Sequence, residues 1–156
     1  MIFPSWREFL PERGRLRASR RKLVLANGCF DLLHAGHIDL LEQARTAGDC
    51  LLVAVNSDAS VRAMKGDGRP ILPQDERMEL LAGLAAVDYV CPFDEPTPRE
   101  LIQAILPDVL VKGADWGPGQ IVGSEEVEAA GGRVVRIPLL AGRSTTNIVA
   151  RVLALP

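Results

Sequence analysis

Several features that mark particular protein classes are missing from this chain of 156 residues. No uncharged apolar run approaches the roughly 18 residues that a membrane-spanning helix requires. The first 22 residues carry seven Arg or Lys side chains and lack the apolar centre of a secretory signal. The seven aromatic residues are too few for a surface that stacks nucleic-acid bases. The sequence therefore predicts a cytoplasmic protein that acts with neither a membrane nor a nucleic acid.

Cysteine and histidine are also scarce. The three cysteines, Cys29, Cys50 and Cys91, lie far apart and form no CxxC pair. This spacing favours a reducing compartment and buried thiols over disulfides or a zinc module. The two histidines, His34 and His37, form an HxxH pair with no third histidine or paired cysteine to complete a metal site. We therefore expect no metal site built from protein ligands alone.

The net charge of −2 is unevenly distributed along the chain. Residues 1–22 carry seven basic and two acidic side chains, whereas residues 23–156 carry 11 basic and 18 acidic ones. This division predicts a basic N-terminal arm over residues 1–22, docked or partly loose, and one domain over residues 23–156. An acidic domain repels an anionic ligand unless basic side chains meet that ligand locally. The basic residues in or beside the loops that we expect to face a ligand are Lys65, Arg69, Arg77, Lys112 and Arg143.

From residue 23 onward, short apolar runs alternate with segments of helical periodicity. The predicted strands, buried on both faces, are Leu23–Ala26, Cys50–Val55, Tyr89–Phe93, Val109–Val111 and Arg133–Ile137. The predicted helices are Gly36–Ala47, Gln74–Leu84, Pro98–Leu106, Ser124–Ala130 and Thr145–Leu153. This alternation predicts a single α/β domain, Rossmann-like and doubly wound, with a five-stranded parallel sheet.

Ligands of such a sheet bind beyond the carboxyl ends of its strands. We therefore expect the site in the segments Asn27–His37, Asn56–Pro73, Lys112–Gly123 and Pro138–Thr146. The first of these places His34 and His37 where a strand passes into a helix, with Gly36 between them. The unpaired N–H groups and partial positive charge of a helix start suit phosphate oxygens. Two imidazoles beside it would donate hydrogen bonds that strengthen as negative charge builds up, although they could also be plain surface histidines.

The residues around the two histidines resemble the signature of the HxGH nucleotidyltransferase superfamily, in its cytidylyltransferase-like branch. The signature residues are Gly28-Cys29-Phe30-Asp31 and His34-Ala35-Gly36-His37. Further segments match along the chain: Val55–Asp58, Lys65–Gly66, Arg69–Pro70, Arg77, Pro107–Trp116, Ile121–Gly123 and Gly142–Thr146. The resemblance covers about residues 23–153 and is strongest to the heptose 1-phosphate adenylyltransferases, which many bacteria fuse to a sugar kinase.

The resemblance implies roles for individual residues. The residues that it implies in catalysis are His34, His37, Lys65 and Arg77. The residues that it implies in nucleotide or substrate binding are Asn27, Gly28, Cys29, Phe30, Asp31, Gly36, Lys112, Gly113, Asp115, Ser144, Thr145 and Thr146. Ser144 is also the residue that we expect to cap the last helix.

The function implied by the resemblance is transfer of AMP from ATP, accompanied by Mg²⁺, to D-glycero-β-D-manno-heptose 1-phosphate. The products would be pyrophosphate and an ADP-heptose precursor for the lipopolysaccharide core. The resemblance further implies a homodimer supplied by a separate sugar kinase. One alternative is a cytidylyltransferase acting on glycerol 3-phosphate or another polyol or sugar phosphate. Another is a nucleotide-binding sensor without turnover, but the complete set of His34, His37, Lys65 and Arg77 favours an enzyme.

Overall fold

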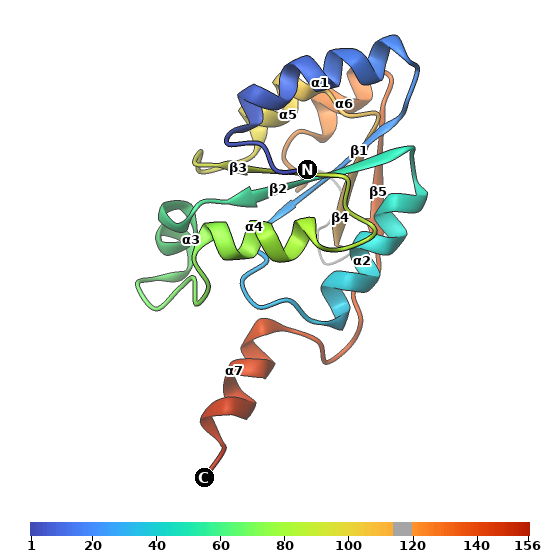
Figure 1. The fold of residues 1–156 in the computed structure, drawn as a ribbon. Helices are drawn as coiled ribbons and strands as arrows, with labels where there is room; N and C mark the ends of the chain where they lie inside the picture. Colours follow the sequence, from blue (N-terminus) through green and yellow to red (C-terminus); the bar gives the residue numbers. More distant parts are fainter. Residues whose placement is uncertain (114–119) are drawn as a thin grey trace.

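The computed structural model describes residues 1–113 and 120–156 (Figure 1). In this part of the chain, five parallel strands form one sheet in the order β3-β2-β1-β4-β5. The strands are β1 (Leu23–Gly28), β2 (Cys50–Asn56), β3 (Tyr89–Phe93), β4 (Val109–Gly113) and β5 (Arg133–Ile137). The predicted Rossmann-like domain with a five-stranded parallel sheet is confirmed.

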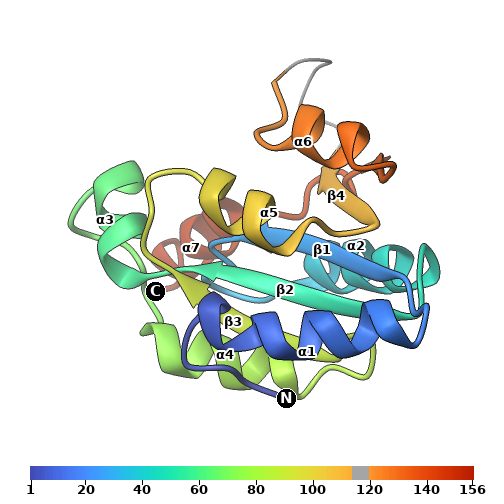
Figure 2. The same ribbon diagram turned by 90° about the horizontal axis from the view of Figure 1, so that it is seen from above.

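Helices cover both faces of the sheet. Figures 1 and 2 show α1, α5 and α6 on one face, and α2 and α4 on the other. The helices are α1 (Trp6–Ala18), α2 (Ala35–Thr46), α3 (Asp58–Lys65), α4 (Gln74–Ala82), α5 (Arg99–Ile105), α6 (Ser124–Ala129) and α7 (Thr145–Leu153). Two of them, α1 and α3, lie in segments for which we predict no helix.

The alternating side chains of the strands build a core on each face. Leu25 and Leu52, paired across β1 and β2, point into the core beneath α1 and α5. Their neighbours Val24 and Val53 point into the core beneath α2 and α4. The prediction that all strands are buried on both faces is wrong for β5, in which Arg133 and Arg136 are exposed. This strand has only β4 beside it, so a charged side chain can reach water there.

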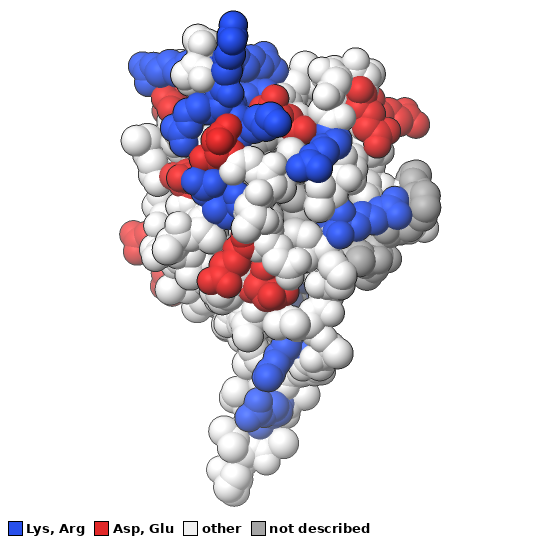
Figure 3. Space-filling model, turned by 90° about the vertical axis from the view of Figure 1, so that its right-hand side faces the viewer, with Lys and Arg blue, Asp and Glu red and all other residues white. Residues whose placement is uncertain are grey.

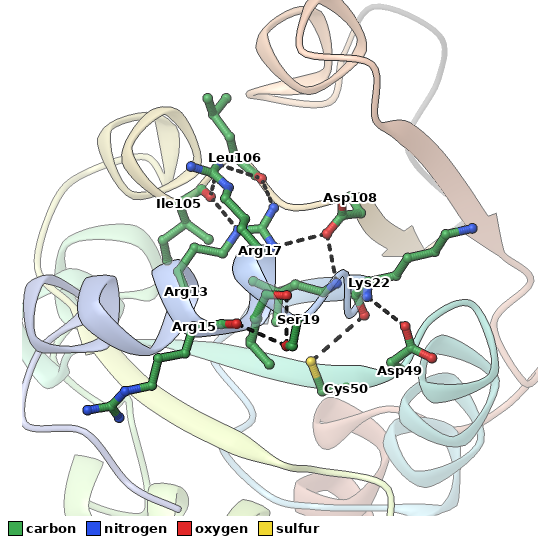
Figure 4. A network of polar contacts seen from close by, with 12 residues as sticks. Arg13, Arg15, Arg17, Ser19, Lys22, Asp49, Cys50, Ile105, Leu106 and Asp108 are labelled. Atoms are coloured by element: carbon green, nitrogen blue, oxygen red, sulfur yellow. Dashed lines mark hydrogen bonds and ion pairs between the residues drawn. The ribbon is translucent and has the colours of Figure 1, made fainter.

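The N-terminal segment is docked on the domain rather than loose. Ser5 caps α1, and Trp6, Phe9 and Leu16 from α1 are buried in the core shared with α5. Arg13, also buried, crosses to the turn that precedes β4, where its guanidinium donates to two carbonyl oxygens and to Asp108 (Figure 4). The apolar and basic residues of the predicted arm therefore hold α1 against the sheet.

The C-terminal helix α7, unlike α1, is not packed on the domain. It has no buried residue and projects from the body of the molecule, as Figures 1 and 3 show. Val152, Leu153 and Leu155 are exposed at its far end. Its N-terminus is ordered by Ser144, whose hydroxyl accepts a hydrogen bond from the N–H of Asn147 at 3.1 Å, as predicted for a helix cap. Across the two described ranges, no helix combines the length and apolar character needed to span a bilayer.

Candidate active site

A cavity of about 440 Å³ opens at the carboxyl edge of the sheet. It lies over the ends of β1 and β4. From β1 the chain adds β2 and β3 on one side of the sheet, and then β4 and β5 on the other side. The end of α3, residues 96–98 before α5, residues 120–122 and Leu139 complete its wall. This is the position at which doubly wound sheets bind ligands, because the connections from neighbouring strands diverge there.

Half of the predicted site residues line this cavity. Those that line it are Asn27, Gly28, Cys29, Phe30, His37, Lys65, Lys112 and Gly113. His34 stacks on His37 beside it, and α7 begins nearby, since the Thr145 hydroxyl donates to the Leu32 carbonyl at 3.4 Å. Ser144 and Thr146 flank Thr145 at this helix start. Asp115 lies outside the described residues.

The two imidazoles form a stacked pair with unused hydrogen-bonding atoms. Their ring centroids are 3.8 Å apart with 19° between the planes. The Nδ1 atoms of His34 and His37, and Oδ1 of Asn27, are buried without a hydrogen-bond partner among the residues that the structure describes. Buried polar atoms in native proteins nearly always have partners, so orphan atoms at a cavity indicate a site for a ligand.

Burial lowers the pKa of both imidazoles and so favours their neutral forms. Burial, with smaller effects of His34 and Lys65, lowers the pKa of His37 to about 4. Burial and the nearby Arg143 lower the pKa of His34. Burial disfavours any charge, but the positive charges of Lys65 and Arg143 favour an anion, as does the start of α2 at His34, where no described side chain forms a cap. The site is therefore matched to phosphate.

Gly36, in the first turn of α2, permits the close approach of the His34 imidazole and of Arg143. A Cβ on Gly36 would lie 3.0 Å from Nδ1 of His34 and 3.2 Å from Cβ of Arg143. Both distances are shorter than ordinary van der Waals contact. The glycine therefore lets the first turn of α2 lie against the imidazole on one side and against the segment leading to α7 on the other.

Two predicted site residues lie beneath the cavity instead of lining it. Arg77 is fully buried and donates hydrogen bonds to protein oxygens alone, including Asp58 at 2.8 Å. Asp31 is 2% exposed and accepts hydrogen bonds from Arg69 and from two backbone N–H groups. Burial alone would raise the pKa of Asp31, but these hydrogen bonds and the Arg69 charge hold it below its usual value.

Asn56, Met64 and Thr97 line the cavity as well, and none of them is among the predicted site residues. Asn56 ends β2, and its amide donates to the Ser60 hydroxyl at 3.0 Å, which fixes its orientation. Its place at the carboxyl end of a buried apolar strand could have identified it as a site residue from the sequence, since ligands bind beyond such ends. Thr97 stands between two prolines in a connection, where the sequence has no periodic pattern to place it.

The comparisons with known proteins agree with this geometry. The sequence model of the family described as cytidylyltransferase-like matches residues 25–137. The chain belongs to the cytidylyltransferase-like family. This membership confirms the predicted nucleotidyltransferase family. The matched range runs from within β1 to the end of β5 and so includes all five strands of the sheet.

Relatives of this cytidylyltransferase-like domain include much longer proteins. It is 57% identical over 136 residues to the bifunctional protein HldE of Halorhodospira halophila, covering 87% of this chain and 28% of that protein. The corresponding protein of Alkalilimnicola ehrlichii is 56% identical over 140 residues, with 90% of this chain and 29% of that protein covered. The chain thus spans less than a third of the length of these curated relatives.

Solved structures share the fold of the cytidylyltransferase-like domain. A lipopolysaccharide core biosynthesis protein from Thermoplasma volcanium superposes with a TM-score of 0.65 at 28% identity, covering 77% of this chain and 98% of that one. Pantoate-beta-alanine ligase from Francisella tularensis superposes with a TM-score of 0.65 at 15% identity, covering 97% and 76%. The second similarity concerns the fold alone.

The chemistry of the described residues does not suit a protein-built Mg²⁺ site. No three His, Cys, Asp or Glu side chains cluster within residues 1–113 and 120–156. The carboxylate of Asp31, the acidic group of the signature, is occupied by Arg69, Ile71 and Leu72. Mg²⁺ is commonly held through substrate phosphates and water, which needs no such cluster of side chains.

Proposed function

We propose that the domain transfers AMP from ATP to a sugar 1-phosphate, specifically D-glycero-β-D-manno-heptose 1-phosphate. The observation that carries this proposal is the stacked pair His34–His37, with orphan Nδ1 atoms at the uncapped start of α2. The names of the similar proteins, HldE and a lipopolysaccharide core biosynthesis protein, support the choice of acceptor.

The reaction needs positioning and charge stabilisation more than proton transfer. An oxygen of the acceptor phosphate attacks the α-phosphorus of ATP, and the bond to the oxygen bridging to the β-phosphorus breaks. Pyrophosphate leaves with the bonding electrons. The acceptor is anionic at neutral pH, so no general base is required. Negative charge on the α- and β-phosphates meets hydrogen bonds from His34 and His37 and the charge of Lys65.

The remaining binding residues surround this centre. We assign phosphate contacts to the start of α7, at Ser144, Thr145 and Thr146, because helix N-termini bind phosphate. Lys112, Gly113 and Asp115, with the backbone of residues 27–30, would hold the nucleotide. Mg²⁺ would enter with ATP and neutralise part of the triphosphate charge.

Product formation with a panel of substrates tests the proposal. Pyrophosphate release is measured with ATP, CTP, GTP and UTP, each combined with heptose 1-phosphate or glycerol 3-phosphate, and the nucleotide product is identified. We expect release with ATP and heptose 1-phosphate and the appearance of an ADP-sugar. Release with CTP and glycerol 3-phosphate would replace the proposal by the cytidylyltransferase alternative. Nucleotide binding without release across the panel would replace it by a sensor.

We also propose a cytoplasmic homodimer that receives the sugar 1-phosphate from a separate sugar kinase. Cys29, Cys50 and Cys91 are free thiols, which suits a reducing compartment. The exposed Val152 and Leu153 of α7, with Leu155 just beyond it, support self-association, because exposed apolar clusters favour contact with another protein surface. Light scattering of the purified chain at micromolar concentration is expected to give twice the chain mass.

A further inference from the structure

Phe30 stands between β1 and α2 with a φ of +47°, a left-handed conformation that residues with a Cβ rarely adopt. Its ring is buried and lies against the ring of His37, with 5.2 Å between the centroids. His37 in turn stacks on His34. A residue other than glycine keeps such a conformation only where its surroundings over-determine it. The position of both imidazoles therefore depends on what holds the backbone of Phe30.

Arg77 holds the peptide on the amino side of Phe30. Its Nη1 donates to the carbonyl oxygen of Cys29 at 2.5 Å and its Nη2 donates to Asp58 at 2.8 Å. Its Nε donates to the carbonyl oxygen of Leu72 at 3.1 Å. The side chain has no exposed surface. Every nitrogen of the guanidinium is therefore bonded to a protein oxygen, and the group does not line the cavity.

Asp31 holds the peptide on the carboxyl side of Phe30. One carboxylate oxygen accepts from Arg69 at 2.9 Å. The other accepts from the N–H groups of Ile71 at 2.8 Å and Leu72 at 3.0 Å. Leu72 is thus bonded on both sides, since its carbonyl accepts from Arg77 and its N–H donates to Asp31. Cys29 is therefore connected to the backbone of Leu72 through Arg77, and Asp31 is hydrogen-bonded to the same residue directly.

We propose that Arg77 and Asp31 are positioning residues, which clamp Phe30 through Leu72 and thereby fix the His34–His37 pair for phosphate. This differs from the direct contact to triphosphate or pyrophosphate that the family resemblance implies for Arg77. A direct contact would require the buried guanidinium to leave three protein acceptors. The inference rests on the proposed function for its kinetic readout but not for its spectroscopic one.

The test uses three variants of the full chain. Arg77→Lys keeps a positive charge but cannot reach three acceptors, because an ammonium lacks the planar fork of a guanidinium. Asp58→Asn weakens the bond between Arg77 and the partly exposed side chain of residue 58. This variant replaces Arg77→Lys in the test if Arg77→Lys does not fold. Arg62→Lys, an exposed substitution of the same type on α3, is the matched control.

Two readouts separate positioning from direct contact. The chain has two histidines, so its proton NMR spectrum without ligand reports the imidazole pair directly. We expect Arg77→Lys and Asp58→Asn to shift both histidine ring signals, and Arg62→Lys to leave them unchanged. We expect kcat for pyrophosphate release to fall about 10²-fold in Arg77→Lys, the order expected for a misplacement of about 1 Å, with KM for ATP within twofold.

Unchanged histidine signals together with a large rise in KM for ATP would overturn the clamp and restore direct contact. If the wild-type chain releases no pyrophosphate with any nucleotide, the proposed function fails and the ligand-free spectra still decide the clamp. Shifted spectra would then support it, and unshifted spectra would refute it.

Discussion

Arg13 at the amino edge of the sheet and the imidazoles of His34 and His37 at the carboxyl edge differ in whether their polar atoms have partners. At the amino edge, the guanidinium of Arg13 donates to the carbonyl oxygens of Ile105 and Leu106 and to Asp108, as Figure 4 shows. At the carboxyl edge, His34 and His37 each keep a buried nitrogen without a partner. Lys65 forms no ion pair there with any residue that the structure describes.

The difference separates stability from ligand binding. A buried charge with all its partners holds elements together, and removing it leaves those partners unpaired. A buried polar atom without a partner costs stability, and a fold retains it where a ligand supplies the missing contact. We therefore expect substitution of Arg13 to change unfolding and substitution of His37 to change turnover.

The largest effect is expected from Arg13→Ala. It removes one hydrogen bond each from Asp108 and the carbonyl oxygens of Ile105 and Leu106, which keep the Leu23 N–H and Arg17 as other donors. At about 1 kcal/mol for each lost bond, the free energy of unfolding should fall by about 3 kcal/mol. Urea denaturation followed by circular dichroism measures this, while activity per folded molecule should stay unchanged. Arg15→Ala is the control, since Arg15 is exposed on the same helix and pairs only with Glu12. Equal destabilisation by the two variants would contradict the assignment of Arg13 to the core.

His37→Ala should have the reverse pattern. Removing one donor to charge that develops in the transition state should lower kcat about 10²–10³-fold. The free energy of unfolding should fall less than in Arg13→Ala, because Nδ1 of the lost imidazole has no partner among the described residues and only ring contacts and one backbone hydrogen bond are lost. Pyrophosphate release and urea denaturation are measured on the same preparation. Near wild-type kcat would remove His37 from the proposed mechanism.

The sheet could be predicted from the sequence because β1, β2, β3 and β4 contain continuous apolar runs, which are visible in the sequence alone. α1 was missed because Pro11 and Gly14 interrupt it and its apolar stripe is sparse. α3 was missed because it is short and polar, within a segment expected to be a ligand loop. The hydropathy pattern of the sequence therefore identifies continuous apolar elements, but not a helix with few apolar residues such as α1 or α3.

The sequence could predict which residues come together at the cavity, but not which way each side chain points. The signature brings His34, His37 and Lys65 to one cavity, as predicted from strand ends. It does not say which way a charged side chain points. Arg77 and Asp31 belong to the same signature, yet both are buried among protein partners supplied by Leu72, Cys29 and Arg69. Those partners lie up to 48 positions away in sequence, so only the folded chain identifies them.

The histidine pair also makes the carboxyl edge sensitive to pH. An unfolded histidine takes up a proton near its usual pKa of about 6.5, whereas His37 in the fold does so near 4. Between these values the unfolded chain binds more protons, so stability should fall as pH drops from about 6.5 to 4. The His37→Asn variant should lose part of this dependence. Bound pyrophosphate should raise the pKa of His37, which NMR titration with and without pyrophosphate measures.

The smallest effect comes from two serines that cap helices at opposite ends of the chain. Ser5 accepts from the N–H of Glu8 at the start of α1, and Ser144 accepts from the N–H of Asn147 at the start of α7. Losing such a cap costs about 1 kcal/mol of helix stability. Because α1 packs in the core, Ser5→Ala should lower the free energy of unfolding by about that amount.

In the dissociated monomer, Ser144→Ala should leave global unfolding unchanged, because α7 buries no residue of its own chain and can fray alone. It should instead raise KM for ATP, since the frayed helix start is the proposed phosphate contact. Urea denaturation, hydrogen exchange of residues 145–148 and initial rates distinguish the two variants. A loss of global stability from Ser144→Ala would mean that α7 is packed against a surface in solution, and dilution of the sample would then show whether that surface belongs to a second copy.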